Sequence, residues 1–441
     1  MVQSLRAMPG GEVRGQLRVP GDKSISHRSI MLGSLAEGPT RISGFLEGAD
    51  ALATMNVFRG MGVAIDGPDG GEVLVHGAGL HGLRAPRGPL ECGNSGTSMR
   101  LLSGLLAAQR FESRLVGDAS LSRRPMRRII EPLALMGAKI DSENGYPPLR
   151  VHPVAGLRGA DIRMNVASAQ VKSALILAGL YADGMTQVTE PAPTRDHTER
   201  MLAAFGVQVE RQGSRVSVTG GRLLTGCRID VPADISSAAF FLVAASICPG
   251  ADLTLRHVGV NPTRTGVLQI LRAMGADITE TAQQTIGGEP VADLRVRGAR
   301  LTGLDIPPEW VPLAIDEFPA LFIAAACAEG VTRLRGAEEL RVKESDRIAV
   351  MAEGLAAIGL PAQATPDGMR IEGRGGEATP FRGGTVQSHG DHRIAMAFAV
   401  AALRASGPIN ILDTENVDTS FPGFAEMAAS VGMPVGPGES R

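Results

Sequence analysis

Two kinds of helical pattern alternate along the chain, and each kind recurs six times. In the first kind, hydrophobic residues follow one helix face and the run ends at a glycine. These runs are 54–61, 128–136, 199–205, 266–274, 348–358 and 423–431, and they end at Gly62, Gly137, Gly206, Gly275, Gly359 and Gly432. Glycine is favoured just past a helix end because it enters the left-handed backbone region freely. The pattern therefore predicts six amphipathic helices that lie on the outside of the fold.

The second kind of run is hydrophobic on every face, and a polar segment precedes it. The six polar segments are 22–26, 93–98, 167–172, 234–237, 315–318 and 389–393. A helix that is apolar all round is a buried helix. Several of the glycine-terminated helices continue into strand-like sequence, as at 139–141. Each repeat thus predicts a buried helix, a strand, an outer helix and further strands, which is a mixed α/β unit.

Six units indicate two domains of three units each. Residues 17–24 and 229–236 resemble each other across the midpoint, as Leu-Arg-Val-Pro-Gly-Asp-Lys-Ser and Ile-Asp-Val-Pro-Ala-Asp-Ile-Ser. We therefore predict an N-terminal domain of residues 21–232 and a C-terminal domain of residues 1–20 plus 233–441. The chain would cross between them near Pro20 and near Pro232. Two crossings close together predict a hinge and a cleft between the domains.

Composition narrows the class of protein. The 441 residues are 44% hydrophobic but only 3% aromatic, with 56 glycines, so the cores must be built from aliphatic side chains and closely packed backbones. The net charge of −2 gives no general attraction to nucleic acid or anionic membranes. The longest apolar runs are too short to span a membrane, and residues 1–13 lack the apolar region of a secretory signal. Four scattered cysteines fit reduced thiols and a cytoplasmic location.

Cationic and hydroxyl side chains gather at the polar segments. Lys23, Ser24 and Arg28 stand where a buried helix begins, and helix N-termini attract anions. A plain helix cap with solvated charges is the alternative reading. Comparable groups occur in other repeats: Asn94–Thr97 with Arg100, Ser168–Gln170, Gly390–Arg393, Arg123–Pro125, Thr194–His197, Pro262–Arg264 and Arg341–Arg347. A surface charge run is again the alternative. Their repetition at equivalent places favours one site for a small substrate with several phosphates or carboxylates.

Two acids are candidates for proton transfer. Asp316 lies in an apolar stretch, whereas Glu344 lies among cations. Burial raises the pKa of a carboxyl group and nearby cations lower it, so such a pair suits general acid–base catalysis. Lys343 and Arg347 are four residues apart, which predicts that they share one helix face. A buried N-cap for the following helix is the alternative role for Asp316.

Other chemistries match the sequence poorly. Gly21-Asp22-Lys23-Ser24 lacks the spacing of a nucleotide-binding phosphate loop. His389 and His392 have no third metal ligand spaced with them, and no dinucleotide-binding fingerprint is evident. The sequence therefore gives no sign of a phosphate loop, a metal site or a dinucleotide site.

These motifs together resemble the 5-enolpyruvylshikimate-3-phosphate (EPSP) synthase family along essentially the whole chain. The segments that carry the resemblance are 21–28, 93–100, 168–170, 194–199, 341–347 and 391–396. The resemblance implies two similar domains, each with three βαβαββ units around buried parallel helices. It also implies transfer of the enolpyruvyl group of phosphoenolpyruvate to the 5-hydroxyl of shikimate 3-phosphate. The resemblance further implies that phosphate leaves after a tetrahedral intermediate and that no metal or organic cofactor takes part.

Carried over residue by residue, the resemblance implies the following site. Shikimate 3-phosphate would be held by Lys23, Ser24, Arg28, Ser168, Ala169, Gln170, Arg195, Asp316 and Lys343. Phosphoenolpyruvate would be held by Lys23, Asn94, Gly96, Arg124, Gln170, Arg347 and Arg393. Asp316 would accept the proton of the attacking hydroxyl, and Glu344 would serve proton transfer at the methylene carbon. A monomer in the cytoplasm is expected.

The chain departs from many members of this family in one place. Many members carry a lysine near the Phe421-Pro422 pair that helps to bind phosphoenolpyruvate, and residues 417–422 contain none. With Ala169 and residues 194–199, this resembles the bacterial subgroup called class II. Some class II members resist the inhibitor glyphosate through an alanine at the position of Gly96, so Gly96 is expected to leave room for it.

Two alternatives stay open at the level of sequence. One is the related enzyme that transfers enolpyruvyl to UDP-N-acetylglucosamine, which usually has a catalytic cysteine in a loop that corresponds to residues 118–124. That loop has no cysteine here, and Cys92 adjoins a turn. The other is a non-catalytic protein that binds small anions on the same scaffold.

Overall fold

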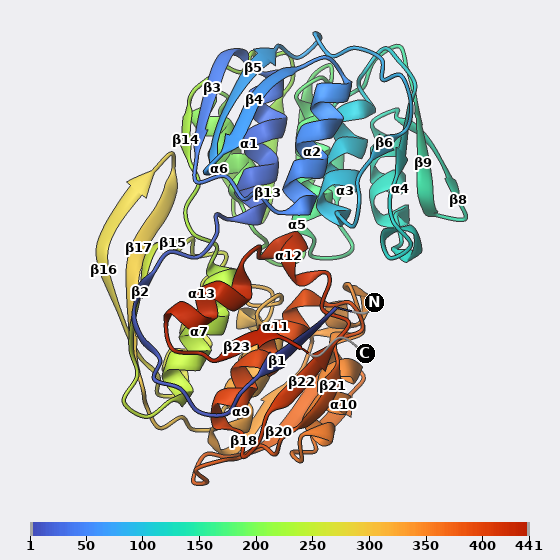
Figure 1. The fold of residues 1–441 in the computed structure, drawn as a ribbon. Coiled ribbons are helices and arrows are strands. Elements are labelled where there is room, and N and C mark those ends of the chain that lie inside the picture. Colours follow the sequence, from blue (N-terminus) through green and yellow to red (C-terminus); the bar gives the residue numbers. More distant parts are fainter. Residues whose placement is uncertain (1–2, 439–441) are drawn as a thin grey trace. The chain divides into compact units, whose positions relative to one another are not determined.

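The structure is a computed structural model that describes residues 3–438, and these residues form two compact units (Figure 1). The first, called here the N-terminal unit, contains Gly21–Val231 and the short segment Thr285–Glu289. The second, the C-terminal unit, contains the residues up to Pro20, Pro232–Gln284 and the chain from Pro290 onward. The segment Thr285–Glu289 includes the turn between two long strands of the C-terminal unit, and sequence analysis gave no sign that it joins the other unit.

Small mixed sheets form the outside of each unit. In the N-terminal unit the strand orders are β14(Arg228–Asp230)-β3(Glu37–Ser43)-β5(Glu72–Ala78)-β4(Ala64–Asp69), β6(Leu90–Glu91)-β7(Ser113–Val116)-β9(Tyr146–His152)-β8(Lys139–Glu143) and β10(Asp161–Arg163)-β11(Met185–Thr189)-β13(Arg215–Thr219)-β12(Glu210–Gln212). In each sheet the first pair is parallel and the other pairs are antiparallel. A parallel pair requires a crossover. A buried helix supplies it between β6 and β7 and between β10 and β11, whereas β14 comes from the end of the unit to pair with β3.

The C-terminal unit repeats this arrangement. Its strand orders are β16(Asp277–Ile286)-β17(Glu289–Arg297)-β15(Asp252–Gly259)-β2(Arg14–Leu17), β18(Glu329–Leu334)-β20(Gly368–Arg374)-β19(Gln363–Thr365) and β21(Gly384–Gln387)-β22(Ile409–Leu412)-β1(Ser4–Ala7)-β23(Val435–Pro437). The second of these sheets has three strands, but isolated parallel bridges from Thr302 and Asp305 to β18 take the place of a fourth. The predicted mixed α/β class is confirmed.

Six buried helices fill the centres of the units, as the all-round apolar runs predict. They are α1(Lys23–Leu35), α3(Gly96–Leu106) and α5(Ala169–Gly179) in the N-terminal unit, and α7(Ile235–Ile247), α9(Phe318–Ala326) and α11(His392–Ala401) in the C-terminal unit. Helix α3 packs against α1 and α5, and α7, α9 and α11 all contact one another. Every residue of α7 is buried.

The six outer helices end where the glycines predict. They are α2(Ala49–Gly60), α4(Arg127–Leu135), α6(His197–Ala204), α8(Gly266–Ala273), α10(Arg347–Ala357) and α13(Phe424–Ser430). All six terminating glycines have positive φ angles, from 85° at Gly206 to 97° at Gly275. An L-residue rarely adopts this backbone conformation, so glycine is needed at each helix end.

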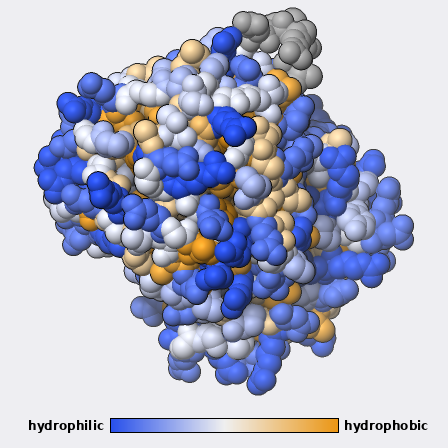
Figure 2. Space-filling model, turned by 90° about the horizontal axis from the view of Figure 1, so that it is seen from below, coloured by the Kyte–Doolittle hydropathy of each residue, from blue (hydrophilic) through white to orange (hydrophobic). Residues whose placement is uncertain are grey.

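Hydrophilic side chains cover most of the face drawn in Figure 2, with hydrophobic residues between them. No helix within residues 3–438 has the length and apolar character needed to cross a bilayer.

Candidate functional site

The N-terminus of α1 presents the first group of predicted residues. Asp22 caps the helix by accepting a hydrogen bond from the Ile25 backbone N–H at 2.9 Å. The Nζ atom of Lys23 lies 2.6 Å from Oδ2 of Asp50 in the first turn of α2, and the Lys23 side chain keeps 22% of its surface exposed. Lys23 is therefore a partly exposed cation at a helix N-terminus, held by one carboxylate.

Arg28 lies one helical turn further along α1 and is buried. Its guanidinium donates to the Ser24 carbonyl at 2.9 Å, to the Thr198 hydroxyl at 2.7 Å and to the Ser173 hydroxyl at 2.8 Å. Burial lowers the pKa of Arg28 to about 10, against the charge of Glu199, which raises it. Arg28 thus stays cationic at neutral pH. Its three hydrogen-bond acceptors are neutral hydroxyl and carbonyl groups, which orient the guanidinium but do not offset its charge.

The N-terminus of α3 brings Asn94, Gly96 and Arg124 together. Ser95 caps the helix, and Arg124 donates to the side-chain oxygen of Asn94 at 2.7 Å. A Cβ atom added at Gly96 would lie 2.9 Å from Nη1 of Arg100 and 3.3 Å from Nη1 of Arg124. Glycine at this position therefore allows two arginine side chains to approach the helix end closely.

The N-terminus of α5 adjoins that of α3. Ser168 caps α5 by accepting from the Val171 N–H, and Ala169 is the first residue of the helix. Gln170 accepts from Arg100 at 2.5 Å and donates to the Thr97 hydroxyl at 3.0 Å. These two bonds fix Gln170 beside the α3 N-terminus, so both helix ends face the same region of the unit.

Arg195 lies in the loop before α6 and is half-buried. Its charge is among those that lower the pKa of Arg28, which places the two cations near each other. The structure thus brings the predicted residues of the N-terminal unit to the N-termini of α1, α3 and α5. The cationic members among them are Lys23, Arg28, Arg124 and Arg195.

Arg347 is the centre of the predicted group in the C-terminal unit. Its side chain is only 1% exposed, and it donates from Nε to Oδ2 of Asp391 at 2.8 Å and from Nη2 to Oε2 of Glu344 at 2.7 Å. Its Nη1 atom lies 3.4 Å from Oδ1 of Asp316. Burial opposes its charge, but the carboxylates of Asp391, Glu344 and Asp316 together raise the pKa of Arg347 above its ordinary value. In the same way, Arg347 lowers the pKa of Asp391 although burial acts in the opposite direction.

Asp316 contacts two further cations. Its Oδ1 atom lies 3.4 Å from Nζ of Lys343, and its main-chain oxygen accepts from Nη1 of Arg393 at 3.1 Å. The N-cap residue of α9 is Glu317, so Asp316 is not the buried helix cap that the sequence left open. The predicted acids Asp316 and Glu344 therefore lie on either side of one buried guanidinium.

One prediction about this group is wrong. Lys343 and Arg347 do not share a helix face, because a short 3₁₀ helix, η3(Glu338–Val342), ends before Lys343 and α10 begins at Arg347. Asp346 caps α10 between them by accepting from the Ala349 N–H. The two cations nevertheless meet, because both reach the same oxygen of Asp316.

Sequence reasoning missed two acidic partners. Asp50 pairs with Lys23, and Asp391 binds Arg347 while also capping α11 through the Arg393 N–H. Asp391 lies in the polar segment 389–393, directly before His392 and Arg393, and this position was its only signal in the sequence. Asp50 gives no signal in the sequence beyond a place near a helix start.

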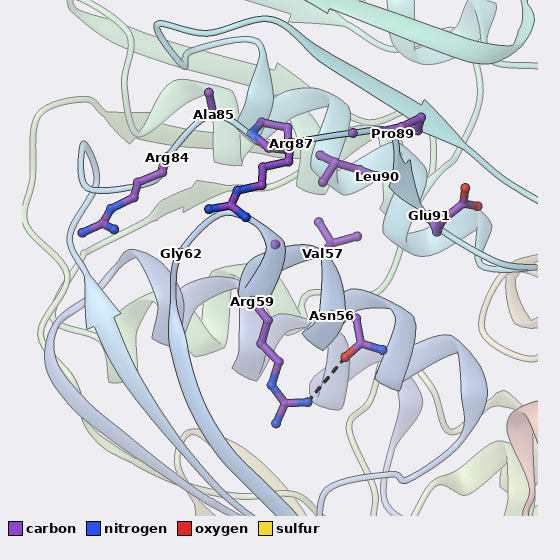
Figure 3. A pocket seen from close by; sticks show the side chains of 13 residues that line it. Asn56, Val57, Arg59, Gly62, Arg84, Ala85, Arg87, Pro89, Leu90 and Glu91 are labelled. Atoms are coloured by element: carbon purple, nitrogen blue, oxygen red, sulfur yellow. Dashed lines mark hydrogen bonds between the residues drawn. The ribbon is translucent and has the colours of Figure 1, made fainter.

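Three observations bear on other kinds of site. Within residues 3–438, no three His, Cys, Asp or Glu side chains are grouped so that they could hold a metal ion. A pocket of about 620 Å³ in the N-terminal unit, lined in part by Arg59, Arg84 and Arg87, includes none of the predicted site residues (Figure 3). Cys92 is buried, and burial raises the pKa of its thiol to about 12, so it is not a reactive nucleophile.

Comparison with known proteins decides the family. The family model described as EPSP synthase (3-phosphoshikimate 1-carboxyvinyltransferase) matches residues 8–427. The chain belongs to this family. It is 67% identical to the 3-phosphoshikimate 1-carboxyvinyltransferase of Alkalilimnicola ehrlichii, over 98% of this chain and 96% of that one. The corresponding protein of Methylococcus capsulatus is 65% identical, over 97% of each chain.

A solved structure of EPSP synthase from Acinetobacter baumannii is 57% identical to this chain and superposes with a TM-score of 0.90. The match covers 99% of this chain and 100% of the Acinetobacter chain. The enolpyruvyl transferase fold that the sequence predicts is thereby confirmed. The predicted activity is confirmed as well: the chain is a transferase of the shikimate pathway, which leads to aromatic amino acids. The alternative acceptor, UDP-N-acetylglucosamine, is not favoured.

Proposed function

We propose that the two groups of residues act as two parts of one site, with different duties. The N-terminal unit supplies most of the cations and hydroxyls that bind the anionic substrates, and the C-terminal unit supplies the acids that move protons. Shikimate 3-phosphate is assigned to Lys23, Ser24, Arg28, Ser168, Ala169, Gln170, Arg195, Asp316 and Lys343. Phosphoenolpyruvate is assigned to Lys23, Asn94, Gly96, Arg124, Gln170, Arg347 and Arg393.

The reaction begins with attack of the 5-hydroxyl of shikimate 3-phosphate on the substituted carbon of the enol double bond. Asp316 accepts the hydroxyl proton, while the methylene carbon gains a proton and becomes a methyl group. The product of this addition is a tetrahedral intermediate that still carries phosphate. Loss of a methyl proton and departure of phosphate then restore the double bond in the product.

The observation that supports this mechanism best is the position of Asp316 and Glu344 on either side of Arg347. Asp316 lies 3.4 Å from Arg347 Nη1, and Glu344 lies 2.7 Å from Arg347 Nη2. A guanidinium fixed by two acids can bind the carboxylate or phosphate of phosphoenolpyruvate with its carbon atoms within reach of both acids. Glu344 is therefore assigned to proton transfer at the methylene carbon.

Measurement of phosphate release tests the proposed activity. The purified protein should release phosphate from phosphoenolpyruvate only when shikimate 3-phosphate is also present. Release with UDP-N-acetylglucosamine instead would favour the related transferase. Tight binding of both anions without any release would favour the non-catalytic alternative and contradict the proposal.

Because each unit holds residues assigned to both substrates, we infer that substrates draw the two units together about crossings near Pro20 and Pro232. Small-angle scattering should show a smaller radius of gyration when both substrates are added, and an unchanged radius would argue against closure. We also expect a monomer, because both parts of the site come from one chain, and a cytoplasmic location. Four free thiols, three of them buried, support a reducing compartment.

A further inference from the structure

A buried lysine in the N-terminal unit has no role in the site described so far. Lys172 lies in the first turn of α5, and its side chain is fully buried. Its Nζ atom lies 2.7 Å from Oε1 of Glu199 and 3.1 Å from Oε2 of Glu190. A buried lysine loses its hydration, so it is retained at a cost that only well-placed partners offset. Two carboxylates around one ammonium satisfy that condition.

This cluster of Lys172, Glu190 and Glu199, called here the Lys172 cluster, joins three elements. Lys172 comes from α5, Glu190 directly follows β11, and Glu199 lies in the first turn of α6. The cluster thus fixes the start of α5 against the start of α6.

The loop that carries Arg195 is bound to the Lys172 cluster through the preceding residue, Thr194. The Thr194 hydroxyl donates to Oε1 of Glu190, and the Thr194 carbonyl lies 3.5 Å from Nζ of Lys172. Thr194 is therefore bound through both its side chain and its backbone. These two contacts hold the backbone directly before Arg195.

Arg28 is attached to the residues next to the cluster. Its two hydroxyl partners are Ser173, which follows Lys172, and Thr198, which precedes Glu199. These hydroxyls also bond to each other at 2.7 Å. Glu199 is the nearby charge that most strongly favours the cationic form of Arg28. The Lys172 cluster therefore supports the positions of both Arg28 and Arg195. None of its three residues is assigned to either substrate.

We propose that Lys172, Glu190 and Glu199 are positioning residues for shikimate 3-phosphate. They hold Arg28 and Arg195 in the arrangement that binds this substrate. Phosphoenolpyruvate should be affected much less, because Asn94, Gly96 and Arg124 lie at the α3 N-terminus. Gln170, which is assigned to both substrates, is held there by Arg100 and Thr97. This inference rests on the proposed function, in which Arg28 and Arg195 bind shikimate 3-phosphate.

The test is steady-state kinetics of Glu190→Gln, with each substrate varied in turn. Glutamine keeps an oxygen for the Thr194 hydroxyl but removes one charge from beside Lys172. We expect KM for shikimate 3-phosphate to rise about tenfold, because a charge-assisted hydrogen bond is lost beside the loop. KM for phosphoenolpyruvate and kcat should stay within about twofold of wild type. Thr194→Val, which removes only one hydroxyl bond, should give a smaller rise in the same KM.

A matched control separates positioning from general loss of stability. Leu149→Ala opens a cavity at a fully buried position of β9, away from these helix starts. It should lower the melting temperature without a selective rise in KM for shikimate 3-phosphate. Equal changes of both KM values in Glu190→Gln, or no change in either, would overturn the inference. Arg195→Ala is measured alongside: if it leaves KM for shikimate 3-phosphate unchanged, the proposed assignment of Arg195 fails, whatever Glu190→Gln shows.

Discussion

The two units use the same structural device, the N-termini of helices, but they surround the arginines at these helix ends differently. In the N-terminal unit, Arg28 donates to hydroxyls, and Arg100 and Arg124 donate to amide oxygens. In the C-terminal unit, Arg347 contacts three carboxylates and Arg264 contacts those of Asp234 and Glu317. Neutral partners orient a cation without offsetting its charge, whereas carboxylates offset part of it.

The difference separates two tasks. A cation with neutral partners remains available to an anionic ligand, so the N-terminal unit is suited to bind phosphate and carboxylate groups. A cation among carboxylates holds those acids in fixed positions, so the C-terminal unit is suited to transfer protons. Substitutions in the two units should therefore affect different kinetic constants.

The largest effect is expected from Asp316→Asn, which removes the proposed base of the C-terminal unit. We expect kcat to fall by about 10² to 10⁴. Binding of shikimate 3-phosphate, measured by calorimetry, should persist. Asp305→Asn is the control, because Asp305 pairs with Arg333 at 3.0 Å on the surface, where ion pairs contribute little. Turnover by Asp316→Asn at the wild-type rate would remove Asp316 from its assigned role.

Arg124→Ala tests the N-terminal unit in the same way. We expect KM for phosphoenolpyruvate to rise by about 10- to 100-fold, because a charged hydrogen-bond donor to this substrate is lost. The neighbouring Arg123 is exposed, so Arg123→Ala serves as a matched control and should leave this KM nearly unchanged. If Arg124→Ala mainly lowers kcat instead, the separation of binding and proton transfer between the units is wrong.

Asp391→Asn should affect stability and its dependence on pH. Because Arg347 lowers the pKa of Asp391 in the folded state, the stabilising contribution is present above the ordinary Asp pKa of about 4 and is lost as pH falls below it. We expect the variant to lose about 3 kcal/mol of unfolding free energy at neutral pH. Denaturant melts at several pH values should show this gap closing in acid. A gap that stays constant down to about pH 3 would contradict the assigned charge state.

Gly96→Ala probes the space at the α3 N-terminus. The added methyl group would press on Nη1 of Arg100, at 2.9 Å, so this side chain must shift. We expect inhibition by glyphosate to weaken about tenfold, with a smaller rise in KM for phosphoenolpyruvate, since crowding a packed site costs about 1–3 kcal/mol. Glyphosate inhibition is measured on the wild type and on Gly96→Ala. Equal inhibition of the two proteins would refute the expectation that Gly96 leaves room for this inhibitor.

The smallest effect is expected from Cys92→Ala. The thiol is buried, and its raised pKa of about 12 keeps it protonated. Phosphate release should therefore remain within about twofold of wild type. Loss of turnover in a variant with an unchanged melting temperature would give Cys92 a chemical role and reopen the comparison with the related, cysteine-dependent transferase.

Much of the fold follows from local sequence. The six glycines mark helix ends because only one residue type fits a positive φ angle easily, and α7 is buried because all its faces are apolar. The three-stranded sheet around β18 was not foreseen, since isolated bridges at Thr302 and Asp305 depend on tertiary packing. Nor was the placement of Thr285–Glu289 with the N-terminal unit.

The site residues were recognisable as motifs, but their partners were not. Asp50 reaches Lys23 from another helix, and Lys172 reads as one polar residue in an apolar run. Such pairs join residues far apart in sequence, and periodicity carries no information about them. The false prediction that Lys343 and Arg347 share a helix face has the opposite cause: spacing in the sequence suggested a helix that the chain does not form there.

The first strands of the chain have a consequence for biosynthesis. β1 pairs with β22 and β23, which lie within the last part of the chain, and β2 pairs with β15. Among these strands, β1 is made before both of its neighbours, so it has no strand to pair with during nearly the whole of translation. The body of the N-terminal unit, Gly21–Val231, can fold as soon as it emerges. We expect protease digestion of stalled nascent chains to show residues 21–231 protected early, and the C-terminal unit protected only after release.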